Sequence, residues 1–187
     1  VPPKKSVPEQ IAIQKDFVEK ELNPRLDEAR LGKRTVFFVD ASHMVLGAFL
    51  SCLWSLMPLF IRSASGRQRY NILGAINPLT LQFFRVCNTQ YINSQSVCEL
   101  LRHIASAGID TPITLVLDNA RYQRCALVQT LALQLNVELL FLPSYSPNLN
   151  LIERLWKFVK KQALNNQHHT SFQDFQRRID SCLDQIS

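Results

Sequence analysis

Short apolar runs, rich in β-branched and aromatic residues, alternate along this chain with longer segments whose apolar positions recur at helical spacing. The short runs predict buried strands, because they are too short for helices and are bounded by polar or turn-forming residues. We expect five strands, at residues 35–40, 70–77, 80–87, 113–118 and 137–142. Helices are expected at 94–107, 121–135, 149–164 and 171–185. The Asn-Pro-Leu-Thr segment at 77–80 predicts a hairpin between the second and third strands.

The N-terminal part of the chain differs from this alternation. Residues 8–30 place apolar positions among charged ones at helical spacing, and Asn23 and Pro24 break the pattern. We therefore predict a helical linker over residues 1–34 that leads into one α/β domain over residues 35–187. A chain of 187 residues with 47% hydrophobic content is large enough for such a domain with a substantial core.

Three acidic residues each stand at the edge of an apolar run. Asp40 and Asp118 end two predicted strands, and ligands collect beyond the carboxyl ends of strands in an open α/β sheet. Glu153 lies near the start of the helix 149–164, after the loop 143–147. Clustered carboxylates repel one another unless a proton or a cation neutralises them, and oxygen ligands favour Mg²⁺ or Mn²⁺ over Zn²⁺. The three acids together predict a metal site.

Each acid taken alone also has an ordinary structural explanation. Asp40 could cap a turn after its strand, and Asp118 could form an Asx turn or a helix N-cap with Asn119. Glu153 could simply favour the positive end of a helix dipole. The combination favours a metal site, because carboxylates are unexpected in segments that are otherwise apolar.

Three blocks of sequence surround these acids: VDASH at 39–43, LVLDNARY at 115–122 and LPSYSPNLNLIERLW at 142–156. Thirty-four residues, 119–152, separate the second acid from the third. From about residue 35 onward the chain resembles the catalytic region of bacterial insertion-sequence transposases of the mariner-like branch of the Asp-Asp-Glu superfamily. Gln123 stands where many relatives carry His, and Leu151 where many carry Pro. Neither change removes a carboxylate, but no role for a histidine can be transferred to position 123.

The resemblance implies a fold. It is the ribonuclease-H-like α/β fold, a mixed five-stranded sheet flanked by helices, in which the first and fourth strands are neighbours. The predicted order of three strands followed by helix, strand, helix, strand and helix agrees with it. That neighbourhood would bring Asp40 beside Asp118.

The resemblance also implies a reaction, the cleavage of DNA at element ends and the joining of those ends to target DNA with two Mg²⁺ or Mn²⁺ ions. In this reading Asp40 binds both ions, and Asp118 and Glu153 each complete one. Asn119 would hold a ligand by a hydrogen bond. The partners would be DNA and a second copy of the chain, as a homodimer on paired ends.

The charge of the chain fits a polyanionic partner without proving one, since the formal net charge is +6. Lys157 and Lys160 share the helix face of Glu153, where they could contact DNA phosphates, while Leu151, Leu155, Phe158 and Ala163 could turn inward. The candidate DNA-binding residues are Arg67, Arg69, Arg121, Arg154, Lys157, Lys160 and Lys161. The alternatives are a solvated helix face and a surface ion pair between Glu153 and Lys157.

Other features limit the cellular setting. The five Cys are scattered without metal-ligand spacing, which suits reduced thiols in the cytoplasm, here of a bacterium and near its nucleoid. The apolar segment 45–61 is too short and interrupted to span a membrane. No secretion signal opens the chain, and residues 1–34 are too few for two helix-turn-helix modules. An opening without Met suggests a fragment.

Two other functions remain open on the sequence. A ribonuclease or junction-cleaving nuclease would use the same fold and acids on hybrids or four-way junctions. A domesticated DNA-binding domain would keep the fold without catalysis. A phosphoacceptor receiver domain does not fit, because Ala41 replaces the expected second acid and Pro143 the expected Lys.

Overall fold

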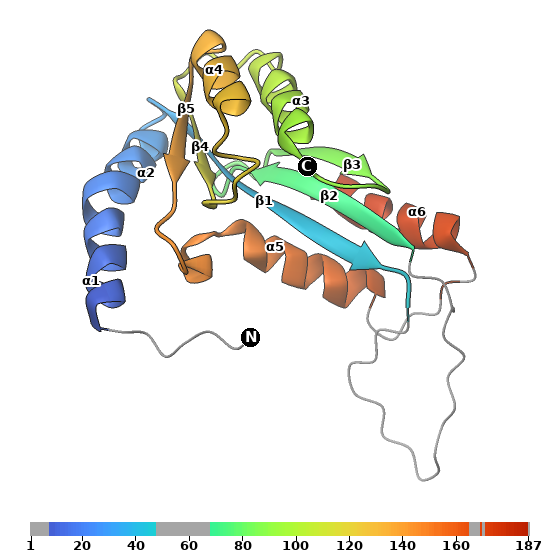
Figure 1. Ribbon diagram of the computed structural model, residues 1–187. Coiled ribbons are helices and arrows are strands. Elements are labelled where there is room, and N and C mark those ends of the chain that lie inside the picture. The colour runs from blue at the N-terminus through green and yellow to red at the C-terminus, as the bar shows by residue number, and fades with distance from the viewer. Residues whose placement is uncertain (1–7, 48–67, 165–168, 170, 187) are drawn as a thin grey trace.

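The computed structural model describes residues 8–47, 68–164, 169 and 171–186. Its centre is one sheet in the order β3-β2-β1-β4-β5 (Figure 1). The strands are β1 (Thr35–Val45), β2 (Arg69–Ile76), β3 (Phe83–Asn88), β4 (Ile113–Leu117) and β5 (Val137–Phe141). β1, β2 and β3 pair antiparallel, whereas β4 pairs parallel to both β1 and β5. The predicted mixed five-stranded sheet, with β1 beside β4, is confirmed.

Helices cover both faces of the sheet. α3 (Ser94–Ala105) and α4 (Ala126–Gln134) lie on one face, and α5 (Ile152–Val159) and α6 (Phe172–Asp184) on the other (Figure 1). Successive β1 side chains alternate between these layers, so Phe37 and Val39 join the α3 side while Phe38 and Met44 join the α5 side. The predicted flanking helices are therefore confirmed.

β1 is longer than the sequence pattern predicts. The expected end at Asp40 is wrong, because the strand continues to Val45. Its pairing with β4 stops at Phe38 and Val116, but its pairing with β2 runs on to Val45 and Arg69. Asp40 thus lies inside a strand, at the place where that strand loses its parallel neighbour.

The predicted break in the N-terminal helix is also wrong. α1 (Pro8–Phe17), the π-helical turn η1 (Val18–Leu22) and α2 (Asn23–Arg30) follow one another without interruption. The backbone N–H of Asn23 bonds to the carbonyl of Val18, and Pro24 stands in the first turn of α2, where a missing N–H donor is tolerated. The domain boundary at residue 35 stays a prediction.

The N-terminal helices contact the core through the buried Leu22, through partly buried hydrophobic residues around it and through a cluster of charges. Leu22 is buried in the core on the α5 side. Glu138 of β5 accepts hydrogen bonds from Arg25 of α2, from Arg34 and from Thr114 of β4. These contacts connect α2 to β5 and lower the pKa of Glu138, chiefly through the hydrogen bond from Arg25.

The segment around Glu153 is helical as predicted, but in three parts. A 3₁₀ turn η2 (Pro147–Leu149) precedes α5, and a π-helical turn η3 (Lys160–Leu164) follows it. Leu155 and Ala163 are buried as predicted, whereas Phe158 is 47% exposed, which is a correction. The inward face is made instead by residues at helical spacing, namely Ile152, Leu155, Trp156, Val159 and Ala163.

The remaining sequence expectations fall partly outside this description. The hairpin between β2 and β3 forms, with an Asx turn in which Asn77 accepts from the N–H of Leu79. Most of the apolar segment 45–61, and Arg67, lie outside the described residues. Within the described part of the chain, no helix is both long and apolar enough to cross a bilayer.

Candidate active site

Asp40 and Asp118 follow the last paired residues of two neighbouring parallel strands. The final β1–β4 pair is Phe38 and Val116, and each acid stands two positions later in its own chain. Because side chains alternate, both carboxylates point to the face that Phe38 and Val116 occupy, which is the side of α5. The predicted neighbourhood of the two acid-bearing strands is confirmed.

Glu153 approaches this pair from α5, where it occupies the first turn. The negative charges of Asp118 and Glu153 both raise the pKa of Asp40, so all three acids lie within electrostatic reach. No three His, Cys, Asp or Glu side chains in the described part of the chain come close enough to hold a metal ion as they stand. Repulsion between carboxylates opposes a closer approach without a cation.

Burial is the main influence on the acidity of the site. It raises the pKa of Asp40 to about 6, with Asp118 and Glu153 adding to the rise and hydrogen bonds from the Ala41 backbone and Trp156 opposing it. The pKa of Asp118 is raised as well, mainly by burial. Such a site disfavours uncompensated negative charge and suits a cation, and its oxygen donors fit Mg²⁺ or Mn²⁺.

Asn150 connects the two strands that carry the acids. Its side-chain amide donates to the carbonyl of Val39, at 3.1 Å, and to Oδ1 of Asp118, at 3.4 Å. It is 3% exposed, and its Oδ1 has no hydrogen-bond partner among the described residues. The sequence reasoning overlooked this residue, although an Asn between Leu149 and Leu151 in an apolar run was a signal of a buried polar role.

Two aromatic residues complete the surroundings of the acids. The indole Nε1 of Trp156 donates to Oδ2 of Asp40 at 3.1 Å. Burial, together with the charges of Asp40 and Asp118, raises the pKa of Tyr122 to about 12, which keeps this phenol neutral near the acids. Neither aromatic residue was predicted as part of the site, because the contact of Trp156 and the effect of Asp40 on Tyr122 both join distant parts of the chain.

Comparison with known proteins places this arrangement in a family. The family model described as DDE superfamily endonuclease matches residues 35–176, which include all three acids. The chain belongs to this family. No curated protein sequence is detectably similar to it.

Solved structures agree with the fold of this DDE endonuclease domain. It is similar to the Mos1 transposase paired-end complex with left transposon end, with a TM-score of 0.72, 16% identity and coverage of 97% of this chain and 56% of that one. For the catalytic domain of Mos1 mariner transposase the TM-score is 0.60, with 15% identity and coverage of 98% and 93%. This chain thus spans a little over half of the transposase chain in the paired-end complex and nearly all of the isolated catalytic domain.

Asn119 is engaged away from the carboxylates of the DDE domain. Its side-chain amide donates to the carbonyl of Leu142, and its Oδ1 accepts from the Arg124 guanidinium at 3.0 Å. The hydrogen bond to Asp118 comes from Asn150 instead. The ligand-holding role of Asn119 therefore stays a prediction, and its observed contacts join the loop after β4 to the segment after β5.

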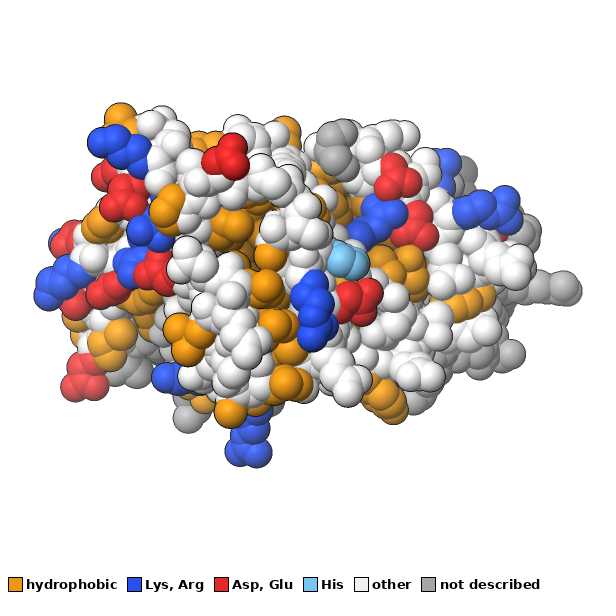
Figure 2. All heavy atoms as spheres, turned by 90° about the horizontal axis from the view of Figure 1, so that it is seen from above, with side chains coloured by type: hydrophobic (Ala, Val, Ile, Leu, Met, Phe, Trp, Pro, Cys, Tyr) orange, Lys and Arg blue, Asp and Glu red, His pale blue; other side chains and the backbone are white. Residues whose placement is uncertain are grey.

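The basic residues predicted to bind DNA are not all near the acids. Five of them are exposed on or near the acid-bearing elements: Arg121, Arg154, Lys157, Lys160 and Lys161. None of the ion pairs among the described residues joins Glu153 to Lys157. On the opposite side of the sheet, the view over α3 and α4 shows mainly hydrophobic and uncharged surface, and most of its basic side chains lie towards the edges of that view, several of them beside acidic ones (Figure 2).

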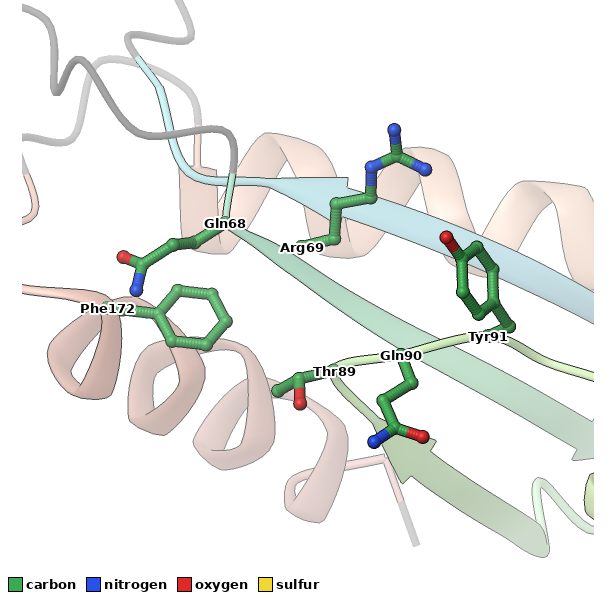
Figure 3. Close-up of a pocket in the computed structure, with 6 residues that line it drawn as sticks. All are labelled: Gln68, Arg69, Thr89, Gln90, Tyr91 and Phe172. Carbon is green, nitrogen blue, oxygen red and sulfur yellow. The ribbon is translucent and has the colours of Figure 1, made fainter.

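Arg69 lies at the other end of the sheet. It pairs with Val45, five positions along β1 from Asp40, which corresponds to about 16 Å of strand. There it lines an open pocket of about 730 Å³ together with Gln68, which precedes β2, with residues of the segment after β3 and with Phe172 of α6 (Figure 3). The three acids do not line this pocket, so Arg69 is separate from the candidate active site.

Proposed function

We propose that this chain is the catalytic domain of a transposase, which cuts DNA at the ends of a mobile element and joins those ends to target DNA. The observation that supports the proposal is the register of β1 and β4 in a DDE endonuclease domain, because Asp40 and Asp118 each stand two positions beyond the same parallel pair, Phe38 and Val116. Similar structures are described as transposase complexes, including one with a transposon end and others with Mn or Mg.

In this proposal the carboxylates hold two divalent cations. Asp40, Asp118 and Glu153 would be their ligands. Bound cations of this kind activate a water or a DNA 3′-hydroxyl and stabilise the leaving oxygen. Hydrogen bonds within the chain reach two of these acids, since Asn150 donates to Asp118 and Trp156 donates to Asp40.

The exposed basic side chains of α5 and η3 would bind the DNA backbone. Arg154, Lys157, Lys160 and Lys161 extend from the same helical segment as Glu153. Phosphate contacts of this kind fix the position of a duplex without reading its sequence. Two ends must be brought together for joining, so we propose a homodimer as the working form, and a bacterial insertion sequence in the cytoplasm as its setting.

Asp118→Asn tests the function. We expect this variant to fold normally, because an amide oxygen can still accept from Asn150, and to lose metal-dependent cleavage by about a thousandfold or more, since a charged ligand is gone. Cleavage of a labelled linear duplex in Mg²⁺, Mn²⁺ and Ca²⁺ measures the effect. Asp110→Asn, at an exposed acid before β4, is the matched control. Full activity of Asp118→Asn would refute the assignment.

Lys157→Ala with Lys160→Ala tests the DNA surface. We expect affinity for a duplex to fall roughly tenfold and the salt dependence of binding to become shallower by about two counterions, because two phosphate contacts are lost. Titrations in EDTA at several salt concentrations measure both quantities. The control Lys33→Ala with Arg102→Ala removes the same charge from exposed positions elsewhere. Equal losses in both double variants would mean that net charge alone governs binding.

A non-catalytic DNA-binding domain is the second candidate, and one observation favours it. The described residues contain no closed three-residue metal cluster. Calorimetry with Mn²⁺ separates the two proposals: binding that requires Asp40 and Asp118 supports the enzyme, whereas absence of binding by the intact chain supports the non-catalytic domain.

A further inference from the structure

The indole ring of Trp156 lies between the sheet and α5 and reaches one carboxylate oxygen of Asp40. Trp156 is 4% exposed, and its only polar atom, Nε1, donates to Oδ2 of Asp40 at 3.1 Å. A buried indole N–H usually requires a partner, but the partner here is an acid of the candidate active site rather than a backbone carbonyl. The ring therefore joins α5 to the reactive edge of β1.

Gly74 gives the indole its space. This residue of β2 is the register partner of Asp40. A Cβ atom at position 74 would lie 2.8 Å from Cη2 of Trp156 and 2.9 Å from Cε2 of Phe83. Gly74 has no positive φ, so its backbone does not require glycine. A glycine inside a strand weakens the sheet unless close approach of another group demands it, and here the close group is the indole.

Phe83 fixes the ring from a third strand. Its ring meets that of Trp156 edge to face, with centroids 6.4 Å apart and planes at 77°. The indole is thus bounded by β3 through Phe83 and by β2 through Gly74, while its own helix carries Glu153. Because both boundaries are tight, the direction of the N–H is set by packing rather than by the carboxylate that receives it.

We propose that Trp156, seated on Gly74 and Phe83, is a positioning residue that holds Asp40 in one orientation for binding a divalent cation. Its N–H occupies one lone pair of Oδ2, and the Ala41 backbone also donates to the carboxylate, so the remaining lone pairs of Asp40 are those that could bind the cation. Hydrogen bonds that orient metal-binding side chains raise metal affinity without touching the metal. This inference rests on the proposed metal-dependent function of the same site.

Mn²⁺ affinity in the absence of DNA tests the proposal. Trp156→Phe keeps an aromatic ring and removes the N–H. Gly74→Ala instead places a methyl group against the indole of Trp156 and leaves every polar side chain unchanged. We expect both variants to bind Mn²⁺ about tenfold or more weakly by calorimetry. Gly47→Ala is the matched control, because no atom lies within 4 Å of a Cβ there, and it should bind as the parent does.

The indole NMR signal supplies a readout that packing alone would not move. The indole ¹⁵N–¹H resonance of Trp156 is assigned as the one that disappears in Trp156→Phe. In the parent protein we expect this resonance to shift when Mg²⁺ is added. Thermal melting checks that each variant is folded. If Gly74→Ala does not fold, Trp156→Phe alone tests the proposal. Parent-like Mn²⁺ affinity in folded Trp156→Phe, with binding lost in Asp40→Asn, would overturn this inference alone. Unchanged binding in Asp40→Asn would instead overturn the proposed function.

Discussion

Asp40→Asn is expected to abolish metal-dependent DNA cleavage while making the metal-free protein more stable at pH 7. The carboxylate is buried against α5, and the charges of Asp118 and Glu153 add to the cost of ionising it. An amide of the same shape removes that charge and can still accept the hydrogen bond from Trp156. Function and stability should therefore change in opposite directions, as expected where a site keeps unfavourable charge for its chemistry.

The stability difference between Asp40→Asn and the parent should depend on pH in a definite direction. Because the pKa of Asp40 is about 6 in the folded protein and lower in the unfolded chain, the folded state binds the extra proton between those values. The contribution of Asp40 to stability then falls as pH rises through this window and stays low above pH 6. The difference between Asp40→Asn and the parent should reach on the order of 1–3 kcal/mol at pH 7 and shrink towards pH 4.

Urea unfolding in EDTA from pH 4 to pH 8 measures this difference. Asp110→Asn, at an exposed acid, is the control and should follow the parent curve. Added Mg²⁺ should stabilise the parent, because it binds only the folded state, and should leave Asp40→Asn unchanged. A variant that is less stable than the parent at pH 7, or that still responds to Mg²⁺, would contradict the prediction.

Most strands and helices could be predicted because the spacing of apolar residues within each segment indicates its secondary structure. β4 and β5 are short apolar runs, and α3 and α6 repeat apolar residues at helical spacing. The extension of β1 also has a local signal, since buried Met44 lies between exposed His43 and Val45, an alternation typical of a strand. The small and polar residues directly after Asp40 nevertheless suggested that the strand ends there. Pro24 misled for the same reason, because a proline in the first turn of a helix looks like a break from the sequence alone.

The candidate site was predictable only in part. Asp40, Asp118 and Glu153 stood out because acids are rare within apolar runs, and the family resemblance implied that β1 and β4 are neighbours, which the structure confirms. The groups that hold these acids did not stand out. No local pattern gave Trp156 or Gly74 a role at the site, because their roles depend on contacts between residues far apart in the chain. Local patterns cannot show such contacts.

Asn150→Asp is expected to destabilise the metal-free protein by about 3–5 kcal/mol at pH 7, since it buries a charge with no partner. The Asn150 amide donates to the Val39 carbonyl and to Asp118, and a carboxylate in its place would face two acceptors, one of them charged. Asn150→Ala, which only removes the hydrogen bonds, should cost less, about 1–3 kcal/mol. The comparison separates repulsion from lost bonding.

Divalent cations should reverse much of this loss if the acids form a metal site. In Asn150→Asp the new carboxylate adjoins Asp118 and adds an oxygen ligand, so Mn²⁺ should raise its melting temperature more than that of the parent. Lowering the pH to about 5 should also restore stability, because a protonated carboxyl can donate to Asp118. Asn150→Ala should show neither recovery. Melting curves with and without Mn²⁺ at pH 5 and pH 7 decide this, and a metal-insensitive Asn150→Asp would indicate that Asp118 binds no cation.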